Sequence, residues 1–180
     1  TSLTRLRLRT QFIDDKEQQL KAEQDLEQMD AMLASTLAFA RDDAEEEAPA
    51  NLDLAKLLHT LCDDFSDLGE TVDYTGPESF TLCCRPLALQ RAITNVLSNA
   101  VSYGGSAHVA LTLEEGACEI LVEDNGPGIP EEELSTVFEP FVRLDPARNR
   151  STGGSGLGLS IARSVMRSHG GDIFLENRSE

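Results

Sequence analysis

The chain has 180 residues, of which 40% are hydrophobic, so it is long enough and apolar enough to fold around a core. Acidic residues outnumber basic ones by 32 to 15, and the net charge of −17 argues against a nucleic-acid partner, because phosphate binding needs clustered Lys and Arg. No apolar run approaches the roughly 20 residues of a membrane-spanning helix, so we expect no direct membrane contact for this segment. Its four Cys lack the spacing of zinc ligands or of a disulfide framework.

Residues 1–44 contain no Gly or Pro and carry two apolar stripes at helical spacing. A polar patch over 14–17 separates the stripes, which predicts a helical hairpin with its turn near residues 14–18. Two helices cannot bury such stripes alone, so we expect a dimer that forms a four-helix bundle. One long solvated helix is the alternative.

An acidic run closed by Pro49 predicts a solvated linker over 45–52. The next helix is expected to be capped by Asn51 or Asp53 and to end at Asp67-Leu68-Gly69. Two short strands follow, over 71–75 and 80–84.

A long helix is then expected to start at Pro86, a residue tolerated in the first turn. Asn95 and Asn99 lie one turn apart on one face of this helix, where amides among apolar neighbours call for polar partners. Exposed or cap-bonding amides are the alternative. The predicted apolar face contains Leu87, Ile93, Val96, Leu97 and Ala100.

Two antiparallel strands are predicted over 107–113 and 118–122, and the second leads into Asp124-Asn125-Gly126-Pro127-Gly128. Gly126 and Gly128 permit positive φ and a close approach of the backbone. An Asp at the rim of a buried strand can accept a hydrogen bond from a ligand amine. Taken alone, the motif fits a strand-ending turn equally well.

A short helix is expected over 130–134, followed by Phe138 and Phe141. Residues 144–154 have little periodicity, which is typical of a functional lid or a disordered loop. Glycines then precede a helix, where backbone N–H groups can bind an anion. The pattern is neither a P-loop nor a convincing dinucleotide fingerprint. That helix ends at His169-Gly170-Gly171, and residues 172–176 are predicted to form a strand.

In their order, these motifs resemble the N, G1, F and G2 boxes of the sensor histidine kinases of two-component signalling. The matching residues are Asn95 with Asn99, Asp124-x-Gly126-x-Gly128, Phe138-x-x-Phe141 and Gly154-x-Gly156-x-Gly158. Residues 1–44 resemble the dimerisation helices of that family. The resemblance implies an α+β chain in which the N-terminal helical hairpin, part of a dimeric four-helix bundle, precedes a two-layer α/β sandwich over 53–180. That sandwich would be of the histidine kinase/gyrase-like ATP-binding type.

The resemblance further implies that the chain binds ATP and Mg²⁺. Asp124 would accept a hydrogen bond from the adenine amine, Gly126 and Gly128 would shape the adenine pocket, and Tyr103 would stack on the base. Asn99 would be the metal ligand, with Asn95 close to the phosphates. The other implied ATP-binding residues are two lid anchors, two lid cations and a turn near the phosphates: Phe138 and Phe141; Arg143 and Arg148; and Gly154, Ser155, Gly156, Leu157 and Gly158.

Position 95 bears on the reaction. In the hydrolytic members of the superfamily, a Glu at this position activates water, whereas Asn95 cannot act as a general base. Phosphoryl transfer to a protein nucleophile is therefore favoured over ATP hydrolysis. The segment from Thr1 to Leu6 resembles the one that follows the acceptor His in this family, so that His is expected just upstream of residue 1. Thr1 would then match a Thr that assists phosphatase activity, which makes Asn95 and Thr1 the expected catalytic residues.

We therefore expect an ATP-dependent protein-histidine kinase core from the cytoplasmic part of a bacterial inner-membrane sensor. It would form a homodimer through residues 1–44 and relay phosphate to the receiver domain of a response regulator. The alternative is a nucleotide-free docking module for that regulator, since Ser102 stands where a basic residue often faces the phosphates. The sequence specifies neither the stimulus nor the regulator.

Overall fold

The structure is a computed structural model that describes residues 10–11, 15–16, 18–20, 22–23, 26, 29, 47–114, 116–144 and 155–178. The hairpin predicted over 1–44, and with it the dimeric bundle, lies largely outside the described residues. Thr1, Arg148 and Gly154 lie outside them as well.

The first described strand, β1 (Ala50–Asp53), pairs antiparallel with β3 (Thr81–Cys84), so that Ala50 lies opposite Cys84. The linker predicted over 45–52 is therefore wrong at its end, because its last three residues belong to a strand. Strand formation depends on a partner that lies 30 residues away in the chain, and the acidic run beside β1 gives no local sign of it.

Helix α3 (Leu54–Asp67) begins directly after β1, and Asp53 is its N-cap. The Asp53 carboxylate accepts hydrogen bonds from the backbone N–H groups of Lys56 at 3.3 Å and Phe80 at 3.1 Å. Of the two predicted capping residues, Asp53 is therefore the correct one. The helix ends before Gly69, whose φ is +92°, as its sequence predicts.

The main sheet has the strand order β2-β4-β5, with strands β2 (Thr71–Thr75), β4 (Ser106–Glu114) and β5 (Ala117–Asp124). Strand β2 runs parallel to β4, and β5 runs antiparallel to it, so the sheet is mixed. Side chains alternate along each strand: Val72 and Val109 face the core, whereas His108 and Glu119 are directed to the other face. The predicted strands of this sheet are confirmed.

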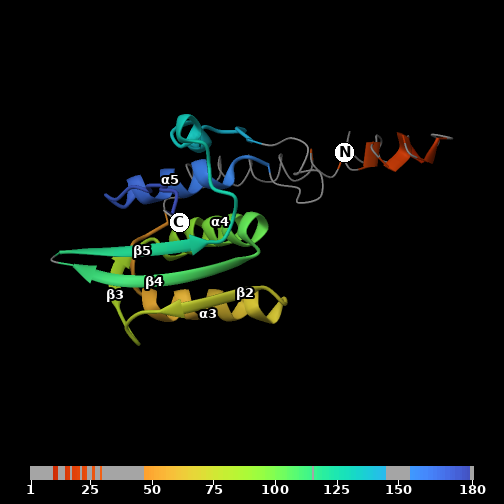
Figure 1. Ribbon diagram of the computed structural model, residues 1–180. Coiled ribbons are helices and arrows are strands. Elements are labelled where there is room, and N and C mark those ends of the chain that lie inside the picture. Colours follow the sequence, from red (N-terminus) through yellow and green to blue (C-terminus); the bar gives the residue numbers. More distant parts are fainter. Residues whose placement is uncertain are drawn as a thin grey trace.

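One face of the sheet is covered by α3 and α4 (Pro86–Gly104), and α5 (Gly158–Ser168) packs against α4 (Figure 1). A single hydrophobic cluster joins these helices to the sheet through Leu58, Leu97 and Val109, which are almost completely buried. The predicted two-layer α/β sandwich is thereby confirmed. Within the described residues, no helix is both long and apolar enough to span a membrane.

The apolar face of α4 is displaced from its predicted position at the start of the helix. Leu87 is 68% exposed, while Leu89, Ile93 and Leu97 are buried. Residues two positions apart lie on nearly opposite sides of a helix, so Leu87 cannot share the face of Leu89.

The N-terminus of α4 is held by groups from two other parts of the chain. The Glu47 carboxylate accepts hydrogen bonds from the N–H groups of Leu87 at 2.8 Å and Ala88 at 3.0 Å. The N–H of Arg85 donates to Nε2 of His169 at 3.0 Å, and Nδ1 of the same ring donates to the carbonyl of Val165. His169 thus ties the end of α5 to the start of α4 as a neutral imidazole.

Two 3-10 turns, η1 (Glu131–Glu133) and η2 (Thr136–Phe138), follow β5. The strand predicted over 172–176 is wrong, because residues 171–178 do not join the sheet. Asp172 instead binds Arg163 and Arg167, and its carboxylate accepts the N–H of Ile173. Hydrogen bonds to the Asp172 side chain are thus formed here instead of hydrogen bonds between strands. Phe174 is 81% exposed.

Candidate functional site

Asp124 ends β5 and lies against the last turn of α4. Its Oδ1 accepts a hydrogen bond from the N–H of Gly126 at 2.7 Å. A Cβ added at Gly104 would lie 2.7 Å from the Cβ of Asp124, and one added at Gly126 would lie 2.7 Å from Oδ1. Both glycines are therefore required for the helix and the turn to approach the carboxylate this closely.

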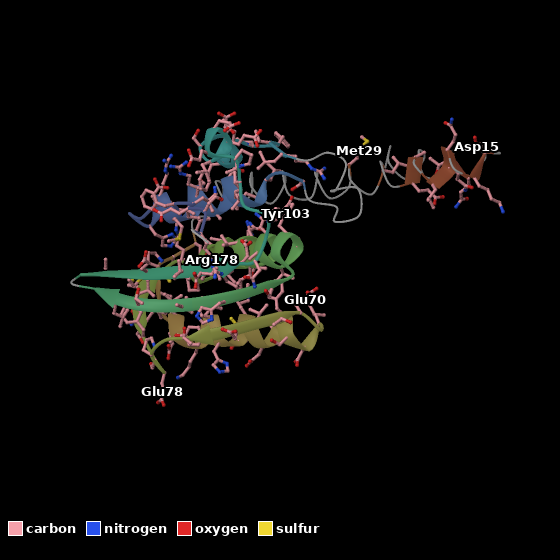
Figure 2. All side chains as sticks on the ribbon, in the orientation of Figure 1. Asp15, Met29, Glu70, Glu78, Tyr103 and Arg178 are labelled. Carbon is pink, nitrogen blue, oxygen red and sulfur yellow. The ribbon has the colours of Figure 1, made fainter. Side chains whose placement is uncertain are left out.

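Gly104 is not among the site residues predicted from the sequence. The pair Gly104-Gly105 does indicate a helix C-terminus, and Gly105 adopts φ +70° as its cap. That signal is local, whereas the contact of Gly104 with Asp124 joins residues 20 positions apart. Tyr103, the preceding residue, is 51% exposed, and Figure 2 shows it at the same end of α4.

Asn95 and Asn99 lie on α4, and both are half-buried. The Nδ2 atom of Asn95 is buried and has no hydrogen-bond partner among the described residues. A buried amide without a partner costs about 1–3 kcal/mol, so this atom indicates a group that is supplied from outside the described chain. Gly158, the first residue of α5, lies beside the same side chain: a Cβ at Gly158 would lie 3.7 Å from the Cβ of Asn95 and 3.8 Å from its Oδ1.

The Phe138-x-x-Phe141 motif and the glycine-rich motif meet at Phe141 and Gly156. The N–H of Phe141 donates to the carbonyl of Gly156 at 2.9 Å. Gly156 has φ +72°, and a Cβ there would lie 2.9 Å from the carbonyl carbon of Phe141. Phe141 itself has φ +69°, an uncommon angle for a residue with a side chain. Leu157, the next residue, is buried.

Phe138 packs against Arg163 of α5, whose guanidinium carbon lies 4.4 Å from the centre of the ring. Arg163 also donates to Asp172, from Nε to Oδ1 at 2.8 Å. The guanidinium groups of Arg163 and Arg167 hold the pKa of Asp172 well below its usual range, so this carboxylate stays ionised. No sequence signal identified this cluster, because Arg163 is five positions beyond the last motif glycine.

The turn after Asp124 is fixed by the C-terminal segment. Asn177 accepts the N–H of Ile129 at 2.9 Å and donates to its carbonyl at 2.7 Å. Gly128 has φ +73°, and a Cβ there would lie 2.8 Å from Oδ1 of Asn177. The second motif glycine therefore serves the turn itself, as its sequence predicts.

The structure thus brings together Asn95 with Gly158, Phe141 with Gly156, and Asp124 with Gly126. Arg143 and Ser155 are half-buried, and both interact with other groups of the chain. In the described part of the chain, no three His, Cys, Asp or Glu side chains are placed to hold a metal ion.

The profile of the histidine kinase-, DNA gyrase B-, and HSP90-like ATPases matches residues 84–180, which is more than half of the chain. The chain therefore belongs to this family. Within it, the chain is 38% identical over 182 residues to the sensor histidine kinase GtrS of Pseudomonas aeruginosa, in an alignment that covers 100% of the chain and 37% of GtrS. It is 34% identical to the sensor protein RstB of Escherichia coli, over 96% of the chain and 42% of RstB.

Solved structures agree with this assignment. The ATP-binding domain of PrrB from Mycobacterium tuberculosis has a TM-score of 0.59 and 27% identity, over 72% of this chain and 88% of that domain. The histidine kinase domain of the Escherichia coli osmosensor EnvZ has a TM-score of 0.56 and 32% identity, over 74% of this chain and 83% of that one. The chain spans about two-fifths of the length of GtrS and RstB.

Proposed function

We propose that this chain is the kinase core of a bacterial sensor histidine kinase. It binds ATP with Mg²⁺, and the γ-phosphoryl group passes to a histidine for relay to an aspartate of a response regulator. The observation that carries the proposal is the buried Nδ2 of Asn95, which has no hydrogen-bond partner among the described residues and belongs to a side chain that lies beside the first residue of α5. A helix start and an amide facing each other suit the phosphates of a nucleotide.

The residues around Asp124 fit an adenine base. One carboxylate oxygen is used by Gly126, and no hydrogen bond occupies the other among the described residues. Gly104 and Gly126 keep side chains away from this carboxylate. Asp124 is the acceptor that we propose for the adenine amine, with Tyr103 beside it to stack on the base.

The residues of α4 and α5 fit the phosphates and the cation. We propose the amide oxygen of Asn99 as the protein ligand of Mg²⁺, which neutralises phosphate charge when it is bound. Asn95 and the amides that start α5 orient the phosphates. Because an amide cannot take up a proton at neutral pH, Asn95 positions rather than activates a nucleophile, which supports transfer over hydrolysis.

The partners belong to the same proposal. Residues 1–44 form the dimer as a helical hairpin, residues from 53 onwards bind ATP, and the receiver domain of a regulator takes the phosphate. Thr1 assists the reverse, phosphatase reaction, and Arg143 and Arg148 pair with phosphate. Alignments with sensor proteins that span 96–100% of the chain support this assignment. The same proposal places the chain in the cytoplasmic part of an inner-membrane sensor.

Calorimetric titration with a non-hydrolysable ATP analogue tests the proposal. The chain is expected to bind the analogue with Mg²⁺ and far more weakly with EDTA. Asp124→Asn is expected to weaken binding at least tenfold, because a hydrogen bond to a charged group is worth about 1.5–3 kcal/mol. Asp64→Asn, an exposed position on α3, is the matched control and should bind as the unchanged chain does.

The absence of binding by a folded chain would contradict the proposal and favour the nucleotide-free docking module, for which Ser102 remains the argument. Steady ATP turnover that Asn99→Ala abolishes would instead favour a hydrolytic enzyme.

A further inference from the structure

Arg163 is the central side chain of a cluster outside the residues assigned so far. Its guanidinium carbon lies 4.4 Å from the centre of the Phe138 ring. Nε donates to Oδ1 of Asp172 at 2.8 Å, and a second nitrogen donates to Oδ2 at 3.4 Å. The side chains of Arg163 and Asp172 are each only 26% exposed. The guanidinium is therefore both stacked on a ring and oriented by a carboxylate.

Arg167 provides an internal comparison. It binds the same carboxylate, with contacts of 3.1–3.3 Å, but its side chain is 58% exposed. Among the described residues, only Arg163 stacks on an aromatic ring in this way. A planar guanidinium can bind a carboxylate through two nitrogens and stack on a ring at once, which a Lys ammonium cannot do.

The stacked ring belongs to a segment that touches α5 at a second point. Three residues after Phe138, the N–H of Phe141 donates to the carbonyl of Gly156. The backbones are so close that a Cβ at Gly156 would lie 2.9 Å from Phe141. A displacement of Phe141 is therefore passed directly to Gly156. Gly158, which faces Asn95, is two residues further on.

We propose that Arg163 is a positioning residue for the phosphate-binding start of α5. By holding Phe138 it fixes Phe141 on Gly156, and thereby sets the position of Gly156–Gly158 opposite Asn95. This inference rests on the proposed function, because that function places the phosphates of ATP at this point.

Four variants test the inference: Arg163→Lys, Phe138→Leu, the double variant of these two, and the control Arg167→Gln. The dissociation constants of a non-hydrolysable ATP analogue and of adenosine are measured for each, with Mg²⁺ present, together with the melting temperature. A contact that only stabilises the fold would change the melting temperature and leave the ratio of the two affinities unchanged. A contact that positions phosphate-binding groups changes that ratio.

Arg163→Lys and Phe138→Leu are each expected to weaken the binding of the ATP analogue about threefold to tenfold. Their affinity for adenosine should stay within about twofold of that of the unchanged chain. The double variant should bind the ATP analogue no more weakly than the weaker-binding single variant, since the two substitutions remove the same contact. Arg167→Gln should leave the ratio unchanged. If either single variant fails to fold, the other still decides the test.

If the unchanged chain binds nucleotide, but Arg163→Lys and Phe138→Leu keep its ratio of ATP-analogue affinity to adenosine affinity, the inference is overturned. An equal change in Arg167→Gln would also overturn it. If the unchanged chain bound no nucleotide, the proposed function itself would fall, and this inference with it.

Discussion

At Gly156, a left-handed backbone coincides with a neighbour that leaves no room for a side chain. Gly156→Ala should destabilise the chain, because a non-glycine residue at positive φ costs about 1–2 kcal/mol and its Cβ would press on the backbone of Phe141. Gly170 also has positive φ, at +84°, but a Cβ there would meet nothing within 4 Å. Gly170→Ala is therefore the control for strain alone.

Urea unfolding of the two variants separates these effects. Gly156→Ala should lose more free energy of unfolding than Gly170→Ala, and it alone should lose affinity for the ATP analogue. Equal losses in both variants would show that the backbone of Phe141 moves away from the added Cβ at no cost in free energy.

Asp53 gives the fold a dependence on acid pH. The hydrogen bond from Ser79 is the main cause that lowers the pKa of this carboxyl to about 2, from a usual 3.8. Because the folded-state pKa is depressed, the ionised carboxylate stabilises the fold fully above about pH 4, and this contribution is lost as the pH falls through 2. Asn also caps helices, so Asp53→Asn removes chiefly the part that depends on charge.

The free energies of unfolding of the unchanged chain and of Asp53→Asn should therefore differ by a constant amount between pH 5 and 7. The difference should shrink as the pH falls from 4 to 2. Asp64→Asn, at an exposed position of α3, is measured alongside as the control for removing a carboxylate from the same helix. A difference that stays constant down to pH 2 would contradict the role of the charge.

Residues of the site were predictable where a motif identifies them. Asn95, Asp124 and Gly156 belong to patterns whose spacing is visible in the sequence, and the structure brings Asn95 close to Gly158 and Gly156 close to Phe141. Gly104 and Arg163 were not predictable, because their contacts join α4 to β5 and α5 to η2. A close approach between distant segments leaves no periodic signal in the chain.

At the scale of elements, α4 depends on an acid that lies outside it. The Glu47 carboxylate takes two N–H groups of its first turn, where Arg85 makes no capping bond with its own side chain. Glu47→Ala should lower the free energy of unfolding by about 1 kcal/mol, through loss of these bonds and of a favourable charge at a helix N-terminus. Glu47→Gln, which keeps one acceptor, should lose less.

Glu70→Ala, at an exposed position between α3 and β2, is the control for removing a negative charge from a strongly acidic chain. Urea unfolding at neutral pH measures all three variants. A loss in Glu70→Ala as large as that in Glu47→Ala would contradict the capping role.

Most elements were predictable from periodicity and from Gly and Pro punctuation. The helices that start at Leu54 and Pro86 and the strands of the main sheet lie close to their expected bounds. Strand β1 was missed because β3, its partner among the described residues, is distant in sequence. The strand predicted over 172–176 contains a short apolar run, but Asp172 at its start pairs with Arg163 and Asn177 just after it pairs with Ile129. Periodicity does not reveal such competition.

At the scale of the whole molecule, burial determines which of the four thiols can react. Cys83 is exposed, whereas its neighbour Cys84 is buried, because successive side chains of β3 point to opposite faces. Burial raises the pKa of Cys62 to about 11, and it also raises the pKa of Cys84 and Cys118. Since the thiolate is the reactive form, the folded chain should react rapidly with a thiol reagent at Cys83 alone.

A colorimetric thiol assay near pH 8 should therefore find one fast thiol in the folded chain and four in denaturant. Cys83→Ser should remove the fast reaction. Fast reaction of two or more thiols in the unchanged chain would show that the core opens readily.

The two bonds from Glu47 also determine where the molecule can be cut. Removal of everything before residue 53 follows the domain division suggested by the sequence, but it discards β1 and leaves the first turn of α4 uncapped. A shortened chain that starts at residue 46 should fold with a cooperative thermal transition, and one that starts at 53 should melt at a lower temperature. The smallest autonomous nucleotide-binding unit is thus expected to begin with the last acid of the run that precedes it.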